Sequence, residues 1–141
     1  MRIRHIKGAE EYIEQSPFVI NEPQSFQGRW KEAVFGNQNP LYLEVGMGMG
    51  QFIRTHAQQH PEYNYIGFEI NSTVLYKALR RYLELREGAG QPAEPEASNL
   101  RFIRQDARFL AEDFGPGEVD RIYLNFSDPW PKDKNANKRL T

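Results

Sequence analysis

Four acidic residues stand at or near the ends of four short apolar runs, and their positions suggest a common site. These acids are Glu44, Glu69, Asp106 and Asp128. In open parallel sheets ligands bind beyond the carboxyl ends of the strands, so acids at four such ends would surround one ligand. One such acid alone is more often a surface or capping residue. Four in equivalent places indicate a binding site at one edge of a sheet.

A glycine-rich turn follows the first acid and narrows the choice of ligand. Residues 46–50 read Gly-Met-Gly-Met-Gly, between an apolar run at 41–45 and a helical run at 51–60. Glycine allows a sharp turn and a close approach of ligand to backbone, so this pattern is typical of nucleotide-binding corners. Glu69 follows Glu44 by 25 positions, which is near the spacing of an acid that accepts hydrogen bonds from ribose hydroxyls.

The glycine spacing by itself leaves several cofactors open, because nicotinamide and flavin enzymes carry similar loops. An acid two positions before the first glycine, here Glu44 before Gly46, is commoner among S-adenosylmethionine enzymes. A carboxylate there would be unfavourable beside a pyrophosphate, whereas it suits the ammonium group of a methionine moiety. The loop therefore favours S-adenosylmethionine over a dinucleotide.

The elements that must position these residues alternate between strand and helix. The runs with strand composition cover residues 41–45, 63–70, 99–104 and 119–126. The helical runs between them begin at Gln51, after a cap at Asn71 or Ser72, and at Ala107. This order predicts an α/β fold with a Rossmann-like, doubly wound and mainly parallel sheet, of which the chain holds the first four strands. Residues 40–141 would form this domain.

Residues 1–39 are predicted to be an N-terminal lead-in segment. It would contain a short helix at 8–15 that ends before Pro17, an extended run at 18–20, and a turn of helix near Trp30. The stretch 88–98 is rich in Gly, Pro and Glu and predicts a mobile loop. Arg80, Arg81 and Arg86 are predicted to lie on a solvated helix face rather than in an RNA-binding patch. Met47 and Met49 are predicted to pack around the glycine loop.

Composition limits the classes of protein that fit. The 141 residues suit one domain, and the absence of cysteine excludes disulfides, thiolate metal ligands and a cysteine nucleophile. His5, His56 and His60 have no metal-ligand spacing, so no metal is expected. No run approaches the ~20 apolar residues of a membrane span, which predicts a soluble, cytoplasmic protein. The net charge is −1, yet residues 121–141 carry five basic and two acidic side chains, where a polyanion could bind.

The C-terminal stretch carries the most specific pattern. Residues 123–132 read Tyr-Leu-Asn-Phe-Ser-Asp-Pro-Trp-Pro-Lys, and a basic run continues to Arg139-Leu140-Thr141. This stretch resembles the bacterial tRNA (guanine-N7-)-methyltransferase family. The glycine loop at 43–50, the run 65–70 and the lead-in motif at 17–20 are also similar to that family, so the resemblance covers nearly the whole chain. It implies a class I methyltransferase that methylates N7 of a guanine in the variable loop of tRNA.

The resemblance also implies roles for individual residues. Those assigned to S-adenosylmethionine are Glu44, Gly46, Gly48, Glu69, Asp106 and Asp128. Asp128 is also the position assigned to catalysis. Those assigned to tRNA are Lys132, Lys134, Lys138 and Arg139. The family typically reads Lys-Lys-Arg-His within this run, whereas Asp133 and Asn135 lower its basic density here. The family continues beyond the Arg-Leu-Thr motif, so an incomplete C-terminus is expected.

Two other readings stay open on the sequence. A nicotinamide-dependent oxidoreductase would use the same glycine loop but leaves Asp128-Pro129-Trp130 and the basic run unexplained. A truncated chain that binds cofactor or RNA without catalysis is the non-enzymatic reading. The expected partner is tRNA rather than a membrane, and the sequence is compatible with a monomer or a homodimer.

Overall fold

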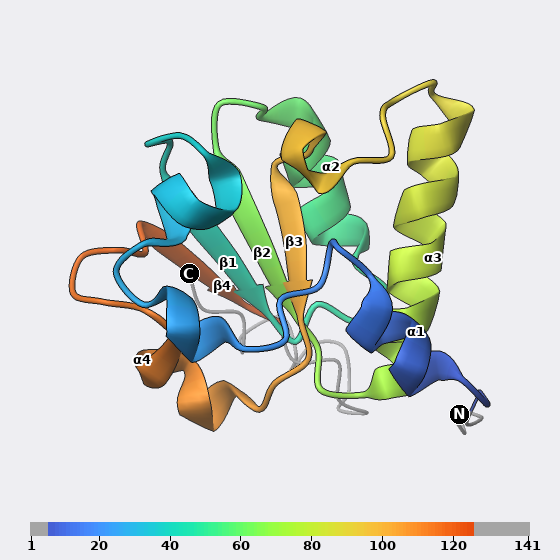
Figure 1. Cartoon of the computed structure of the whole chain (residues 1–141), viewed down its shortest axis with the longest axis horizontal. Helices are drawn as coiled ribbons and strands as arrows, with labels where there is room; N and C mark the ends of the chain where they lie inside the picture. Colours follow the sequence, from blue (N-terminus) through green and yellow to red (C-terminus); the bar gives the residue numbers. More distant parts are fainter. Residues whose placement is uncertain (1–5, 126–141) are drawn as a thin grey trace, which may run out of the picture.

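Four parallel strands form the centre of the molecule. The computed structural model describes residues 6–125 of the chain. The strand order is β3-β2-β1-β4 (Figure 1). The strands are β1 Leu41–Val45, β2 Asn64–Phe68, β3 Leu100–Ile103 and β4 Arg121–Leu124. The predicted α/β fold with a parallel sheet of four strands is therefore confirmed, and each strand lies within the run predicted for it.

The order in which the chain adds strands to the sheet changes side after β3, so that β4 lies next to β1. From β1 it steps outward to β2 and β3, and then returns to place β4 on the other side of β1. In this register Glu44 of β1 stands opposite Gly67 of β2 and Tyr123 of β4. Neighbouring parallel strands whose connections leave in opposite directions open a crevice at their carboxyl ends. The fold therefore places its crevice at the ends of β1 and β4.

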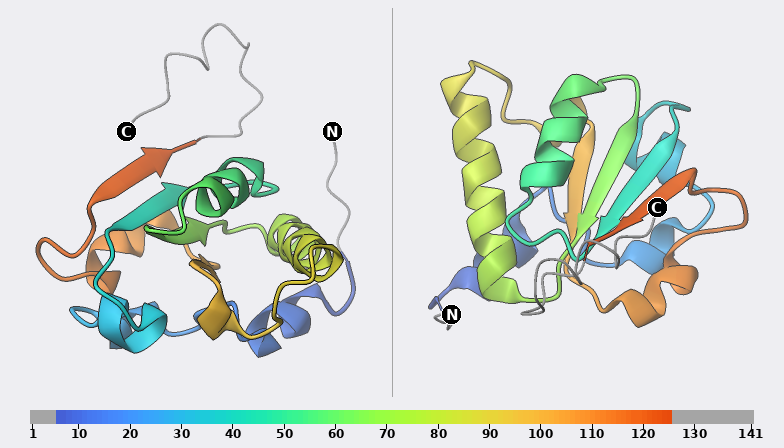
Figure 2. Two further views of the ribbon diagram at one scale, coloured as in Figure 1. Left: turned by 90° about the horizontal axis from the view of Figure 1, so that it is seen from above. Right: turned by 180° about the vertical axis from the view of Figure 1, so that it is seen from behind.

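Helices cover both faces of the sheet (Figure 2). On one face α2 (Gln51–Gln59) and α3 (Ser72–Gly88) pack with α1 (Ala9–Gln15) around a buried cluster that includes Ile53, Leu79 and Phe102. The other face is covered by the short helices η1 (Pro23–Phe26), η2 (Trp30–Phe35) and α4 (Leu110–Asp113). Two short 3₁₀ turns complete the elements, η3 (Pro95–Ala97) and η4 (Ala107–Phe109).

Alternation along β1 decides where its acid points. Leu41, Leu43 and Val45 pack on the Trp30 side of the sheet, while Tyr42 packs on the α2 side. Because side chains of a strand alternate between the two faces, Glu44 shares the face of Tyr42. Its relative exposure is only 1%. A carboxylate is thus held inside the protein, one residue before the carboxyl end of the central strand.

The lead-in segment contributes to both cores. Phe18 and Val19 are buried, and the chain here pairs with β3 through a hydrogen bond from the Ile20 amide to the Phe102 carbonyl. Trp30 is fully buried, and its Nε1 donates to the carbonyl of Asp113 at 2.7 Å. The predicted helical turn near Trp30 is confirmed as η2.

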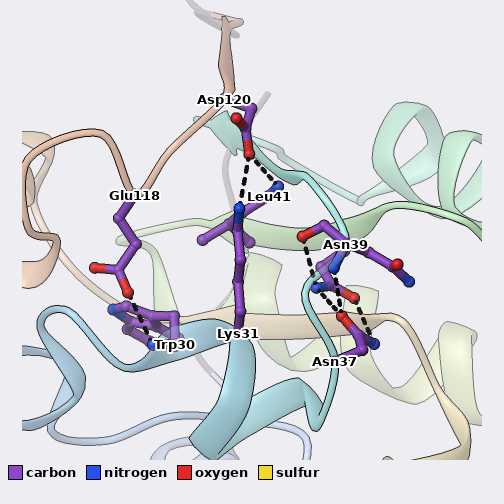
Figure 3. A network of polar contacts seen from close by, with 8 residues as sticks. Trp30, Lys31, Asn37, Asn39, Leu41, Glu118 and Asp120 are labelled. Atoms are coloured by element: carbon purple, nitrogen blue, oxygen red, sulfur yellow. Dashed lines mark hydrogen bonds and ion pairs between the residues drawn. The ribbon is translucent and has the colours of Figure 1, made fainter.

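Polar contacts fasten the lead-in to the β4 side of the sheet (Figure 3). The Trp30 amide donates to Glu118 at 2.8 Å. Asp120 accepts from the Leu41 amide at 2.8 Å and pairs with Lys31 at 3.3 Å. Segments far apart in the sequence are therefore held together just before β1 and β4 begin.

Two predictions about individual side chains were wrong. Arg86 was expected on a solvated helix face, but it is buried because it anchors the loop after α3: its guanidinium donates to the Pro92 carbonyl at 2.7 Å. Arg80 and Arg81 are exposed, as predicted. Met47 is buried in the core as expected, whereas Met49 is 48% exposed because it lies at the outer turn of the glycine loop.

Candidate functional site

The glycine loop turns sharply at the end of β1. Gly46, Gly48 and Gly50 have φ of 76°, 59° and 79°, in the left-handed region that side chains disfavour. The amides of Gly46 and Met47 both donate to the carbonyl of Phe68, at 2.9 and 3.0 Å. A Cβ on Gly46 would overlap the carbonyl oxygen of Asn125. The loop is therefore folded against β2 and β4 with bare backbone, and the predicted role of the glycines in the turn is confirmed.

Glu69 links this loop to the start of α3. Its Oε1 accepts from the Gly48 amide at 2.9 Å, and its Oε2 accepts from the Asn71 amide at 3.0 Å. Asn71 in turn caps α3, accepting from the Val74 amide at 3.0 Å, so of the two predicted caps, Asn71 and Ser72, the structure uses Asn71. A carboxylate offers about four lone-pair positions, so Glu69 can hold the loop and still accept from a ligand hydroxyl.

Glu44 meets a residue that the sequence reasoning missed. The side-chain amide of Asn125 donates to Glu44 Oε2 at 3.3 Å, and the Asn125 backbone amide donates to the Val45 carbonyl at 3.0 Å. Asn125 directly follows β4, so this contact spans the crevice between the two strands. The signal that could have identified Asn125 is its position near the end of the fourth predicted strand, which puts it at the same edge of the sheet as the acids.

Asp106 occupies the loop after β3 and caps η4. Its Oδ1 accepts from the Arg108 amide at 2.9 Å, and its carboxylate pairs with the Arg108 guanidinium at 3.2 Å. The hydrogen bonds from the backbone and side chain of Arg108 lower the pKa of Asp106. Asp106 is therefore ionised at neutral pH and remains partly accessible.

A hollow of about 560 Å³ opens beside the glycine loop. Its lining includes Gly48, Phe52, His56 and Asn125. Phe52 and His56 stack at 4.2 Å between ring centroids, and burial, together with the neighbouring His60, lowers the pKa of His56. Two of the lining residues are therefore aromatic, and the described lining contains no acidic residue, lysine or arginine.

Gly67 is a second residue that the sequence reasoning missed. A Cβ on Gly67 would stand 2.5 Å from Met47 Sδ and 3.5 Å from Ile53. The bare position in β2 therefore lets the loop residue Met47 lie across the sheet. A glycine inside a strand often marks such a close approach, which is the signal that could have identified it.

The structure gathers part of the predicted site. Glu44, Glu69 and Asp106 stand at the carboxyl ends of β1, β2 and β3, and both Glu44 and Glu69 contact residues at the crevice. The other predicted site residues lie outside the described residues; these are Asp128, Lys132, Lys134, Lys138 and Arg139. Within residues 6–125, no group of three or more acidic or His side chains could hold a metal ion.

Comparison with known proteins identifies the family. A family model described as "Putative methyltransferase" matches residues 38–141. The chain belongs to this methyltransferase family. Membership agrees with the glycine loop and with the acids at the strand ends, and it does not favour the nicotinamide-dependent alternative.

Curated relatives of this family member match along its whole length. Proteins named tRNA (guanine-N(7)-)-methyltransferase are 51% identical in Lachnoclostridium phytofermentans, 45% in Listeria innocua and 45% in Streptococcus suis. Each alignment covers 100% of this chain but 61%, 61% and 62% of the respective relative. The chain therefore spans about three fifths of the length of the curated relatives it matches.

A solved structure supports the fold. The crystal structure of the antibiotic-resistance methyltransferase Kmr aligns with a TM-score of 0.50 at 24% identity. The alignment covers 72% of this chain and 46% of that chain. The four-stranded sheet therefore has the arrangement of a methyltransferase fold. Across residues 6–125, no helix has the length and apolar character to cross a membrane.

Proposed function

We propose that the protein transfers a methyl group from S-adenosylmethionine to N7 of a guanine in the variable loop of tRNA. The observation that carries this proposal is identity of 45–51% along the whole chain with proteins named for that reaction. The site agrees with it, because a glycine loop and three acids stand at the carboxyl edge of the sheet. A bacterial cytoplasm, where tRNA is found, is the proposed location.

The described residues fit S-adenosylmethionine. Gly46 leaves no room for a side chain beside Asn125, and Gly48, where a Cβ would point into open space, leaves the loop backbone bare for a ligand. Glu69 keeps acceptor positions for ribose hydroxyls, and Glu44 carries a carboxyl group just before the loop, the residue type that suits an ammonium group. Asp106, ionised at the next strand end, completes the acidic rim. When bound, S-adenosylmethionine would supply the electrophilic methyl group.

The chemistry at guanine requires positioning more than proton transfer. N7 carries a lone pair and no proton, so its methylation requires no general base. The protein must hold N7 in line with the methyl group, and such alignment can supply much of the rate. Positive charge moves onto the purine during transfer. We assign to Asp128 the stabilisation of this charge and the acceptance of guanine N–H groups.

The test measures N7-methylguanine in unmodified tRNA incubated with the protein and labelled S-adenosylmethionine. Asp128→Ala should abolish product while tRNA binding, measured by fluorescence anisotropy, stays within about two-fold of wild type. Asp133→Ala is the matched control, since it removes a neighbouring acid that has no assigned role, and it should remain active. Unchanged turnover in Asp128→Ala would remove Asp128 from the mechanism.

The same incubation decides between a catalyst and a non-catalytic binding chain. Product formation supports the enzyme, whereas S-adenosylmethionine binding without product supports the non-catalytic reading. Whether the protein acts as a monomer or a homodimer follows from light scattering with and without tRNA.

A further inference from the structure

A basic groove lies between α2 and α3, next to the glycine loop. Its lining contains four basic side chains, Arg54 from α2 and Lys77, Arg80 and Arg81 from α3. One acid, Glu84, is also present. The two helices run side by side on the same face of the sheet (Figure 2). Positive charge is thus concentrated in one shallow groove on a chain whose net charge is −1.

Three of these basic groups have no acidic partner among residues 6–125. Arg80 is committed, because it donates to the Tyr76 hydroxyl at 3.0 Å and lies 4.0 Å from Glu84. No described carboxylate lies within 4.0 Å of the charged groups of Arg54, Lys77 or Arg81. Burial and the charge of Arg81 lower the pKa of Arg54. Like charges brought this close repel each other, and an anion between them would relieve the repulsion.

The groove and the hollow beside the glycine loop share a wall. Met49 and Gln51 line both of them. Arg54 also touches the loop directly, since its guanidinium donates to the Met49 carbonyl at 3.3 Å. An anion in the groove would therefore sit next to the loop that is proposed to hold the methyl donor.

We propose that Arg54, Lys77 and Arg81 form a phosphate-binding groove that holds the backbone of the RNA substrate beside the glycine loop. This inference rests on the proposed function, because it assumes an RNA substrate. A polynucleotide suits the groove better than a membrane, since the charges line a shallow groove between two helices that borders the glycine loop, where the methyl donor is proposed to bind. Phosphate contacts of this kind fix the orientation of the RNA without reading its sequence.

The test compares two double variants that remove the same charge. Lys77→Gln/Arg81→Gln alters the groove without touching the glycine loop, and Arg29→Gln/Lys31→Gln removes two basic side chains on the η1 and η2 side of the sheet. Affinity for tRNA is measured by fluorescence anisotropy from 50 to 300 mM KCl. The groove variant should bind about ten-fold more weakly at low salt, with a salt slope smaller by about 1.5, because each phosphate contact adds ~0.7–0.9 to the slope.

The outcomes separate the groove from the reaction. S-adenosylmethionine affinity should stay within about two-fold of wild type in both variants. Equal tRNA affinity of the groove and control variants would overturn the inference. Binding to vesicles that contain phosphatidylserine is measured in parallel, and a groove variant that lost only this vesicle binding, with normal tRNA affinity, would overturn it too. If wild type makes no N7-methylguanine while tRNA binding still depends on Lys77 and Arg81, the proposed reaction fails and the groove stands.

Discussion

Glu69 connects two parts of the candidate site, the glycine loop and the start of α3. Its two oxygens accept from the amides of Gly48 and Asn71, which belong to the glycine loop and to the cap of α3. Hydrogen bonds to a charged acceptor are roughly twice as strong as neutral ones. The carboxylate therefore fixes the loop before any ligand binds, and an acid at the end of the second strand positions the site as well as offering acceptors to a ligand.

Glu69→Gln should weaken S-adenosylmethionine binding by about ten- to a hundred-fold. The amide keeps one acceptor oxygen, but its NH₂ group would face a backbone N–H, and losing a charge-assisted hydrogen bond costs about 1.5–3 kcal/mol. Isothermal titration calorimetry measures the affinity. Glu87→Gln, the same change at an exposed position of α3, is the control and should bind normally. Wild-type affinity in Glu69→Gln would show that the loop holds its shape without this carboxylate.

Asp113 gives a prediction about pH. It is fully buried, and this burial raises the pKa of its carboxyl, while Gln105 donates to its Oδ1 at 3.1 Å. Because the pKa in the folded protein exceeds that of the unfolded chain, the carboxyl contributes most stability below the unfolded value. That contribution is lost as pH rises through the folded pKa.

Asp113→Asn should therefore raise the melting temperature at pH 8 by about 3 °C, as expected for ~1 kcal/mol in a domain of this size. The asparagine keeps the acceptor for Gln105 and removes the buried charge. The gain should shrink toward pH 4, because the raised pKa favours protonation of the wild-type carboxyl as pH falls. Thermal unfolding followed by circular dichroism at both pH values measures it. A lower melting temperature at pH 8 would mean that the ionised form is stabilised by its surroundings.

At the scale of elements, β2 and the glycine loop can pack closely because Gly67 has no side chain. Gly67 stands opposite Glu44 in the sheet, and Met47 lies over it. Packing therefore holds the loop on β2, in addition to the hydrogen bonds that the Phe68 carbonyl accepts from the loop. A larger residue at 67 would displace the loop, so this position couples the stability of the sheet to the shape of the site.

Gly67→Ala should destabilise the protein by about 1–3 kcal/mol, the usual cost of overpacking a core. The new Cβ would lie 2.5 Å from Met47 Sδ. Met47→Ala should lower the free energy of unfolding less in the Gly67→Ala variant than in wild type, because it removes the clash. A double-mutant cycle from urea unfolding measures the difference. Gly88→Ala, at a helical position with nothing within 4 Å, is the control and should be neutral or stabilising. Strict additivity would contradict the contact.

At the scale of the whole molecule, local sequence patterns predicted the helices and strands. They could not predict the contacts between residues far apart in the sequence. The glycine spacing, the Asn71 cap and the alternation of strand and helix are properties of neighbouring residues, so the sequence displays them. The contact between Glu44 and Asn125 joins positions 81 apart, and only the folded sheet brings them together. The same holds for the contact between Met47 and Gly67.

The helical spacing of α3 could have predicted that Arg86 is buried, although arginine is usually exposed. It lies four positions after the buried Tyr82 on α3, hence on the same helix face. Arginine is rarely buried without partners. Its partners, Gln91 and the Pro92 carbonyl, belong to a loop whose composition alone predicted only mobility.

Glu118 connects segments that are far apart in the sequence. Its Oε1 accepts from the amides of Gly28 and Gly115 at 2.7 and 2.9 Å. Its Oε2 accepts from the Trp30 amide at 2.8 Å, the contact drawn in Figure 3. Gly28 and Glu118 are 90 positions apart. This one carboxylate therefore fastens the lead-in to the turn before β4, and with it the fully buried Trp30.

Glu118→Ala should lower the free energy of unfolding by about 2–4 kcal/mol, because three backbone amides lose a charged acceptor at once. Glu118→Gln should lose less, since its remaining oxygen still accepts. Urea unfolding measures both, and limited proteolysis should show faster cleavage within residues 21–40. Glu112→Ala removes an exposed acid from the neighbouring α4 and should change stability by less than about 0.5 kcal/mol. If Glu118→Ala unfolds at the same urea concentration as Glu112→Ala, the lead-in is held by Trp30 packing rather than by this carboxylate.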